Sequence, residues 1–159
     1  MQFDDWLLAL HVLSASALMG AIVFFWAAAL SLRRAERTED MANLGRLLPI
    51  GSVAVAAGSI GVLVFGVWLA IALDGVQVWD GWVIAAIILW AIATELGRRS
   101  GTAYDGIVAK ARERASAGES EAGPELRALA RSNGPLLFHA AATAVIVIIL
   151  VDMIWKPGA

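Results

Sequence analysis

The chain has 159 residues, of which 60% are hydrophobic and 16% charged, with a net charge of -2 and a mean hydropathy of +0.75. A soluble domain carries about 25% charged residues, and one this small cannot bury so much apolar surface, so the composition excludes a soluble globular fold. The absence of cysteine excludes disulfides, thiolate metal sites, iron–sulfur clusters and covalently attached c-type haem.

The first apolar segment, residues 6–32, follows an acidic start at Asp4 and Asp5. A secretory signal has a basic start and an apolar core of about 7–15 residues, so we expect a spanning helix and no cleavable signal. Three further apolar segments cover residues 47–73, 79–96 and 135–155. Each approaches or exceeds the ~20 residues that cross the hydrocarbon as a helix. The sequence predicts an all-α, four-helix transmembrane bundle, as one membrane domain over residues 1–159.

The basic residues predict the orientation of this bundle. Eleven of the twelve lysines and arginines lie in or beside the first connection or within the third, residues 97–134, and Lys156 is the exception. Basic loops stay in the cytoplasm, so we expect a cytoplasmic 97–134 loop and both termini on the extracytoplasmic side. The predicted location is the bacterial cytoplasmic (inner) membrane, with the lipid bilayer as partner and no nucleic acid. The tryptophans expected near the outer boundary are Trp6, Trp68, Trp79, Trp82 and Trp155, with Trp26 near the inner one.

The 97–134 connection is expected to be partly helical. Residues 102–115 are suited to extend the third helix, and Pro124 suits the first turn of a short helix that ends at Arg131. The Asn133-Gly134-Pro135 run is expected to break the chain before the fourth span.

Small residues recur along the first two spans, including Gly51, Gly58, Gly61 and Gly66 in the second. Such residues let helix backbones approach closely in lipid. One interpretation is tight packing within the bundle, and the other is a face for homodimer formation.

Ionisable side chains inside a membrane are costly and therefore mark candidate functional positions. Counted from the polar ends of each span, His11 lies ~12 Å outward of the membrane centre and His139 ~9 Å inward of it. The two histidines are then ~20 Å apart along the membrane normal. A shared metal needs both imidazoles within ~2 Å of the ion, so we expect His11 and His139 not to share one.

These depths place the candidate residues at two heights in the membrane, one near the outer boundary and one near the inner boundary. Met153 is expected near the height of His11, and a His/Met pair is a chemically sensible axial pair for haem b or for copper. His11 is therefore the predicted metal ligand, and His11 with Met153 the predicted cofactor-binding residues. The alternatives are that His11 hydrogen-bonds a neighbouring helix and that Met153 packs or faces lipid.

Glu95 and His139 are expected at a similar height in the membrane, and together they form a second pair of candidate site residues. An i,i+4 ion pair between Glu95 and Arg99 would satisfy the carboxylate at the interface. Asp152 likewise stands one turn before Lys156, close to water, where the same pairing is expected.

The run from Trp6 to Gly20 resembles the first span of several bacterial membrane families, in which a Leu-His-Val/Ile start precedes small residues and a glycine. They include CopD-type copper-resistance membrane domains and HemJ-type protoporphyrinogen oxidases. The layout of the whole chain most resembles a family of predicted integral membrane proteins of unknown function. The resemblance implies that His11 matches the first-span histidine, with a haem or copper role in the CopD- and HemJ-like relatives. Met19 stands where those relatives often have tryptophan, and there is no Met- or His-rich tract for copper capture.

Three functions are compatible with these patterns. The first is a small membrane protein that binds haem b or a metal ion through His11 and serves redox or metal handling. The alternative is a non-catalytic accessory protein that packs into a homo-oligomer or a larger membrane complex. The third is a proton-coupled transporter, in which Glu95 and His139 would need to line a water-filled path through the membrane. None of the patterns assigns an enzymatic activity.

Overall fold

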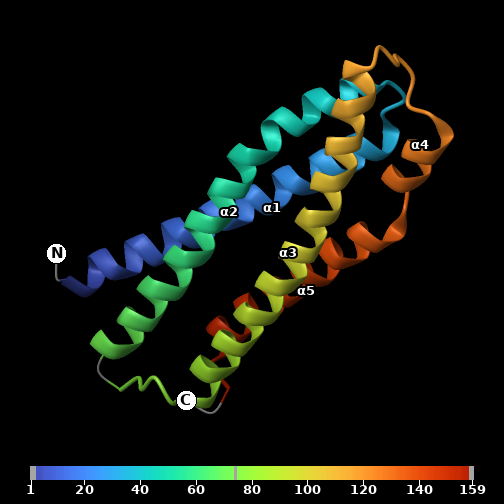
Figure 1. Cartoon of the computed structure of the whole chain (residues 1–159). Helices are drawn as coiled ribbons and strands as arrows, with labels where there is room; N and C mark the ends of the chain where they lie inside the picture. Colours follow the sequence, from blue (N-terminus) through green and yellow to red (C-terminus); the bar gives the residue numbers. More distant parts are fainter. Residues whose placement is uncertain (1–2, 74, 158–159) are drawn as a thin grey trace.

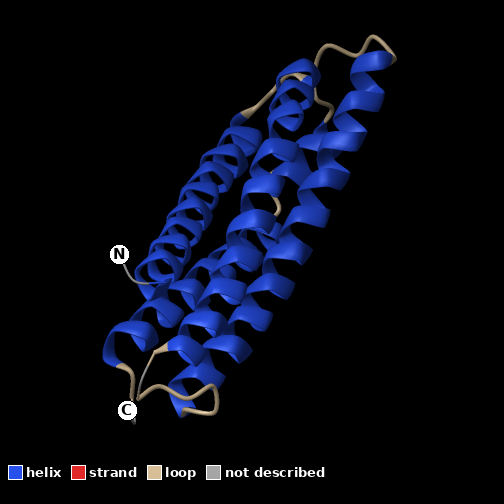
Figure 2. Ribbon diagram, turned by 90° about the vertical axis from the view of Figure 1, so that its left-hand side faces the viewer, coloured by secondary structure: helices blue, strands red, loops and turns tan. Residues whose placement is uncertain are grey.

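The computed structural model describes residues 3–73 and 75–157, whose regular structure is almost entirely helical (Figure 2). The elements in chain order are α1 (Phe3–Arg34), α2 (Thr38–Ala72), α3 (Gly81–Ser116), α4 (Pro124–Ala130) and α5 (Asn133–Trp155). In Figure 1 the four long helices run along one another, and the short α4 lies beside one end of them. That end carries most of the arginines, and we call it the basic end.

Four helical segments are long and apolar enough to cross a membrane, and they cover the four predicted apolar segments except for residue 73 and residues 79–80. Much of their apolar surface faces outward: Ile50, Val53 and Leu13 expose 70%, 69% and 66% of their surface. So large an exposed apolar surface is unfavourable in water and is the ordinary lipid-facing surface of a spanning helix. The all-α four-helix bundle is confirmed, and the chain is a multi-pass membrane protein.

The helices pack as two close pairs. The most extensive contacts join α1 to α2 and α3 to α5, and α2 and α3 link the two pairs, whereas α1 touches α5 at few places. Neighbours in the sequence are thus neighbours in space for the first three spans, as short connections between antiparallel helices require. The contact between α1 and α5 depends on long side chains rather than on close backbones.

Glycines on α2 allow the close approach of α1. A Cβ placed on Gly58 would lie 2.9 Å from the backbone nitrogen of Leu18 and 3.0 Å from the carbonyl oxygen of Ser14. A Cβ on Gly61 would collide with the Ser14 side chain. The small residues of the second span are therefore used inside the chain, as the packing interpretation expects.

The helical parts expected within residues 97–134 are confirmed, since the third helix extends through residues 102–115 and a short helix begins at Pro124, but the break before α5 lies earlier than expected. The third helix continues to Ser116, and the chain breaks at Ser132, so that Asn133, Gly134 and Pro135 already belong to α5. The second helix begins at Thr38, well before the predicted residue 47. The second helix starts early because Met41 of its first turns packs among residues of α3 and α4, which apolar runs in the sequence do not indicate.

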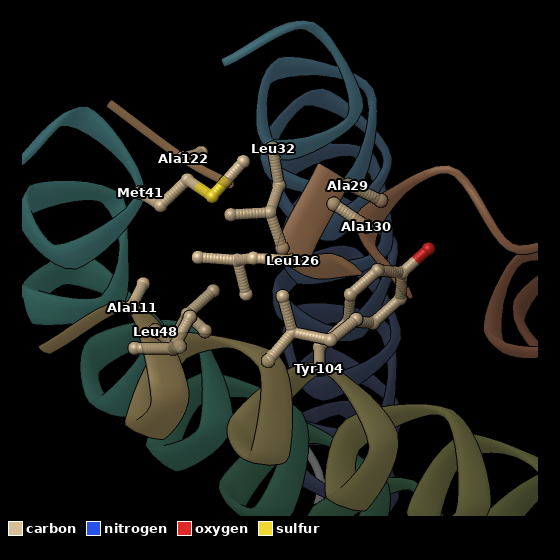
Figure 3. Close-up of a cluster of buried hydrophobic side chains, with 11 residues drawn as sticks. Ala29, Leu32, Met41, Leu48, Tyr104, Ala111, Ala122, Leu126 and Ala130 are labelled. Atoms are coloured by element: carbon tan, nitrogen blue, oxygen red, sulfur yellow. The ribbon is translucent and has the colours of Figure 1, made fainter. Parts of the chain in front are cut away.

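The largest cluster of buried side chains in the described chain also lies at the basic end (Figure 3). We call it the head cluster; it consists of Ala29, Leu32, Met41, Leu48, Tyr104, Ile107, Val108, Ala111, Ala122, Leu126 and Ala130. Leu126 of α4 is 1% exposed and lies among side chains from α1, α2 and α3. Backbone bonds from Thr38 to Ser120 and from Ala122 to Glu36 tie the two connections together over this cluster.

One of the tryptophans expected at the outer boundary is placed differently. Trp82 lies at the start of α3, but its side chain points inward and is 7% exposed. Trp79 and Trp155 are 70% and 74% exposed, as expected of boundary residues. Trp82 instead forms a small cluster with Ala70 and Val83, because the 75–80 hairpin folds α3 back against α2 there.

Candidate functional site

His11 lies on α1 and its imidazole rests on α2. The Nδ1 atom is 3.1 Å from the backbone carbonyl oxygen of Val62. A Cβ on Gly66 would lie 2.9 Å from Cε1 of the ring and 3.1 Å from Nδ1. Glycine at position 66 therefore makes room for the imidazole.

This contact determines which nitrogen of His11 carries the proton. A carbonyl oxygen only accepts hydrogen bonds, so Nδ1 is the donor and Nε2 keeps its lone pair. In metal sites a ligating histidine donates its other ring N–H to a carbonyl or carboxylate in the same way. His11 is thus held in the tautomer that can ligate through Nε2.

Met153, the predicted partner of His11, lies on α5 and packs against the cluster of Ala70, Trp82 and Val83. The described contacts of His11 are with Val62 and Gly66 instead. No residue is common to the two sets of contacts, so the pairing of His11 with Met153 stays a prediction.

A hollow on α2 lies apart from His11. That shallow hollow is apolar and does not include His11; it is lined by Leu63, Val64, Val67, Trp68 and Ile71.

His139 of α5 is buried between α5 and α1. Its ring centroid lies 4.9 Å from that of Trp26 and 6.5 Å from that of Phe25, both in edge-on arrangements. Trp26 donates from Nε1 to the hydroxyl of Thr143 at 3.1 Å, and Thr143 donates to the backbone carbonyl of His139 at 2.9 Å. The Nε2 atom of His139 is buried without a hydrogen-bond partner in the described chain. These bonds join α1 to α5, whose backbones approach each other at few places.

The two histidines contact α1 at different levels. His11 belongs to α1 itself, and Trp26, which touches His139, follows it by 15 residues, or about 22 Å of helix. This agrees with the expectation that the histidines do not share a metal. In residues 3–73 and 75–157, no group of three or more His, Cys, Asp or Glu side chains could hold a metal ion.

Glu95 forms the expected ion pair and a second one. Its carboxylate accepts from Nε of Arg99 at 2.7 Å and from Nε and Nη2 of Arg98 at 2.8 and 2.9 Å. The carboxylate is partly exposed, and its described contacts are with arginines of its own helix rather than with His139. The residues thus give Glu95 an interfacial structural role and do not connect it with His139.

The expected pairing of Asp152 with Lys156 is wrong. The ammonium of Lys156 lies 5.3 Å from the ring centroid of Trp82, and Oδ2 of Asp152 is buried without a partner in the described part of the chain. The reason is local: Lys156 adopts a left-handed conformation with φ of 41° and ends α5. Its side chain therefore leaves the i,i+4 position that an ion pair along a continuous helix requires.

A hydrogen bond from His11 to a neighbouring helix was one of the alternatives that the sequence offered, and the structure shows it. The identity of its partners, Val62 and Gly66, and the bond from Trp26 to Thr143 were not anticipated from the sequence. Gly66 was recognised only as one of several small residues. Searches against protein-family models, curated proteins and solved structures find no match to this chain.

Proposed function

We propose that this chain is a small multi-pass protein of the bacterial cytoplasmic membrane that binds haem b or a metal ion through His11, for redox or metal handling. The supporting observation is the 3.1 Å contact between Nδ1 of His11 and the carbonyl oxygen of Val62. It leaves Nε2 as the ligating atom, in the arrangement that ligating histidines use.

Gly66 serves this contact in two ways. In a helix the carbonyl of residue 62 points toward the N–H of residue 66, so a side chain at position 66 would cover that carbonyl. The same side chain would also overlap the imidazole ring. Glycine at position 66, one turn after Val62, therefore leaves the carbonyl of Val62 accessible to His11 and holds the imidazole in one orientation.

Haem b fits the available donors better than a bare ion does. A porphyrin contributes four nitrogens of its own, so one histidine suffices as an axial ligand, with methionine a suitable second. A bare zinc or copper ion wants three or four protein ligands, and the described residues hold no group of three His, Cys, Asp or Glu side chains. Met153 is the candidate second ligand.

The alternative, a non-catalytic accessory subunit, relied on the small-residue faces as contact surfaces. Gly58 and Gly61 face α1 within the same chain, so this alternative no longer has that surface as its support. If the chain has this accessory role, we propose that its partners are further copies of the chain or the subunits of a larger membrane complex.

The test is an optical spectrum of protein made in haem-replete cells and purified in mild detergent. We expect a Soret band in the wild type, loss of that band in His11→Ala, and the same loss in Gly66→Ala, which keeps the histidine but displaces its ring. Gly20→Ala is the matched control, because a Cβ there meets nothing within 4 Å. His139→Gln is the second control and should keep the band.

Metal analysis of the same preparations covers the case of a bare ion. A wild type that is both colourless and free of metal would contradict the proposal and favour the accessory role. An unchanged cofactor content in His11→Ala, with the bundle still folded by circular dichroism, would contradict it as well.

A further inference from the structure

The N-terminus of α5 lies at the basic end without a cap of its own. The N-cap residue Ser132 makes no side-chain capping bond, and the first turn of α5 contains no acidic residue. The first N–H groups of a helix have no intrahelical partner and carry a partial positive charge. Gly134 is exposed there, and a Cβ on it would meet nothing within 4 Å, so the start of this helix is open to a ligand.

Two arginines converge on the same place from the ends of other helices. Arg33, in the last turn of α1, donates from Nη1 to the carbonyl of Ser132 at 2.7 Å and from Nη2 to Oδ1 of Asn133 at 3.2 Å. Arg131, which follows α4, donates from Nε to the carbonyl of Arg33 at 3.4 Å. A guanidinium has five N–H donors, so both arginines keep donors for a further acceptor.

The charges of these two arginines are not balanced by carboxylates in the described chain. Arg98 and Arg99 pair with Glu95, and Arg114 pairs with Glu119 and Glu125, whereas neither Arg33 nor Arg131 forms an ion pair within residues 3–73 and 75–157. The two guanidinium groups at this place therefore carry positive charges that no ion pair within the described residues balances.

Tyr104 adds a buried donor to this group. Its side chain is 8% exposed, and its hydroxyl has no hydrogen-bond partner in the described chain. Figure 3 shows the hydroxyl directed away from the aliphatic side chains of the head cluster. Burial raises the pKa of this hydroxyl, and the positive charge of Arg33 opposes that shift. A buried hydroxyl without a partner is destabilising, and a bound ion is one of the explanations for such a group in a native structure.

We propose that Arg33, Arg131, the Tyr104 hydroxyl and the backbone N–H groups of Asn133 and Gly134 at the start of α5 bind a phosphate group. A phosphate has several acceptor oxygens, and it is the anion that helix N-termini and arginines bind together. The group is either free inorganic phosphate or the headgroup of an anionic phospholipid, because the basic end is expected at the membrane surface where such headgroups lie.

The free-phosphate arm of the test measures thermal unfolding by tryptophan fluorescence in an uncharged detergent. Sodium phosphate is compared with sodium chloride at the same ionic strength. The lipid arm uses native mass spectrometry to compare retention of phosphatidylglycerol with retention of phosphatidylcholine. We expect the wild type to prefer phosphate, phosphatidylglycerol or both over the matched neutral or chloride control.

Tyr104→Phe is the decisive variant, because it removes one oxygen that has no protein partner. Without phosphate or anionic lipid it should unfold at the wild-type temperature or slightly above, and its affinity for the preferred ligand should fall about three- to tenfold. The double variant Arg33→Gln with Arg131→Gln should lose more than about tenfold. Arg46→Gln removes an exposed arginine at the same end and should keep the wild-type affinity.

The results of the two experiments distinguish the two possible ligands. A shift with phosphate but no lipid preference assigns the site to free phosphate, and retention of phosphatidylglycerol without a phosphate shift assigns it to a headgroup. If Tyr104→Phe and the double arginine variant bind as the wild type or Arg46→Gln does, the site does not exist. Neither arm depends on the role proposed for His11.

Discussion

The guanidinium of Arg112 donates from Nη2 to the backbone carbonyl of Gly45 at 2.8 Å. In a regular helix this carbonyl would accept from the N–H of residue 49, but residue 49 is proline, which has none. The side chain from α3 thus replaces the missing donor of α2. Gly45 is buried, and a Cβ there would overlap Val108 of α3, so the two helices are in direct contact at this point.

The first prediction is that Arg112 and Pro49 are energetically coupled. Arg112→Ala should lower the free energy of unfolding by about 1–2 kcal/mol, since it leaves the carbonyl of Gly45 without its donor. In a Pro49→Ala background, where the N–H is restored, the same change should cost much less. Equilibrium unfolding in mixed detergent and SDS micelles, followed by tryptophan fluorescence, measures the four proteins of this cycle. Equal costs in both backgrounds would show that the bond does not compensate for the proline.

The second prediction concerns the contact between α1 and α2. Gly58→Ala should destabilise the protein by about 1–3 kcal/mol or more, because the new methyl group meets backbone atoms that move only if the helices separate. Gly20→Ala, the control in open space, should be neutral or stabilising by up to about 1 kcal/mol. The same unfolding assay compares the two variants. A Gly58→Ala protein as stable as Gly20→Ala would contradict the close packing of these helices.

The third prediction concerns orientation in the membrane and rests on the distribution of basic residues. Reporter fusions at Gly118 should show a cytoplasmic location, because the 97–134 connection carries seven of the twelve basic residues. Fusions at Gly75, or after Ala159, which lies outside the described residues, should show an extracytoplasmic location. A cytoplasmic reporter after Ala159 would reverse the expected topology.

The fourth prediction concerns the bond that joins α1 to α5. Thr143→Val keeps the shape of the side chain but leaves Nε1 of Trp26 without its acceptor. The expected cost is about 1–3 kcal/mol, that of an unsatisfied buried donor. Thr94→Val changes an exposed threonine of α3 and should alter stability by less than about 0.5 kcal/mol. Equal effects of the two changes would indicate that the Trp26 bond contributes nothing.

The helical architecture could be predicted from the sequence because it depends on local composition. A run of apolar residues long enough to cross the bilayer has only one way to satisfy its backbone in lipid, which is to form a helix. The depth of each residue follows from its distance along that helix, which is why the separation of His11 from His139 agrees with the expectation. The ion pair of Glu95 with Arg99 was predictable for the same reason, since both lie on one helix.

Contacts between helices were decided by the tertiary structure. Apolar runs do not state which face of a helix meets which neighbour, because lipid and protein interior are equally apolar. The contacts of His11 with Val62 and Gly66 therefore form only when α1 lies against α2. The inward turn of Trp82, and the departure of Lys156 from Asp152, likewise depend on how the ends of α3 and α5 meet.

The basic end shows the same division most clearly. The sequence by itself determined that residues 97–134 are polar, basic and partly helical. Only the tertiary structure decided that Arg33 and Arg131 meet at the start of α5. The physical reason is that these groups are up to 98 residues apart in the chain, so their meeting depends on the packing of the head cluster and not on any local pattern.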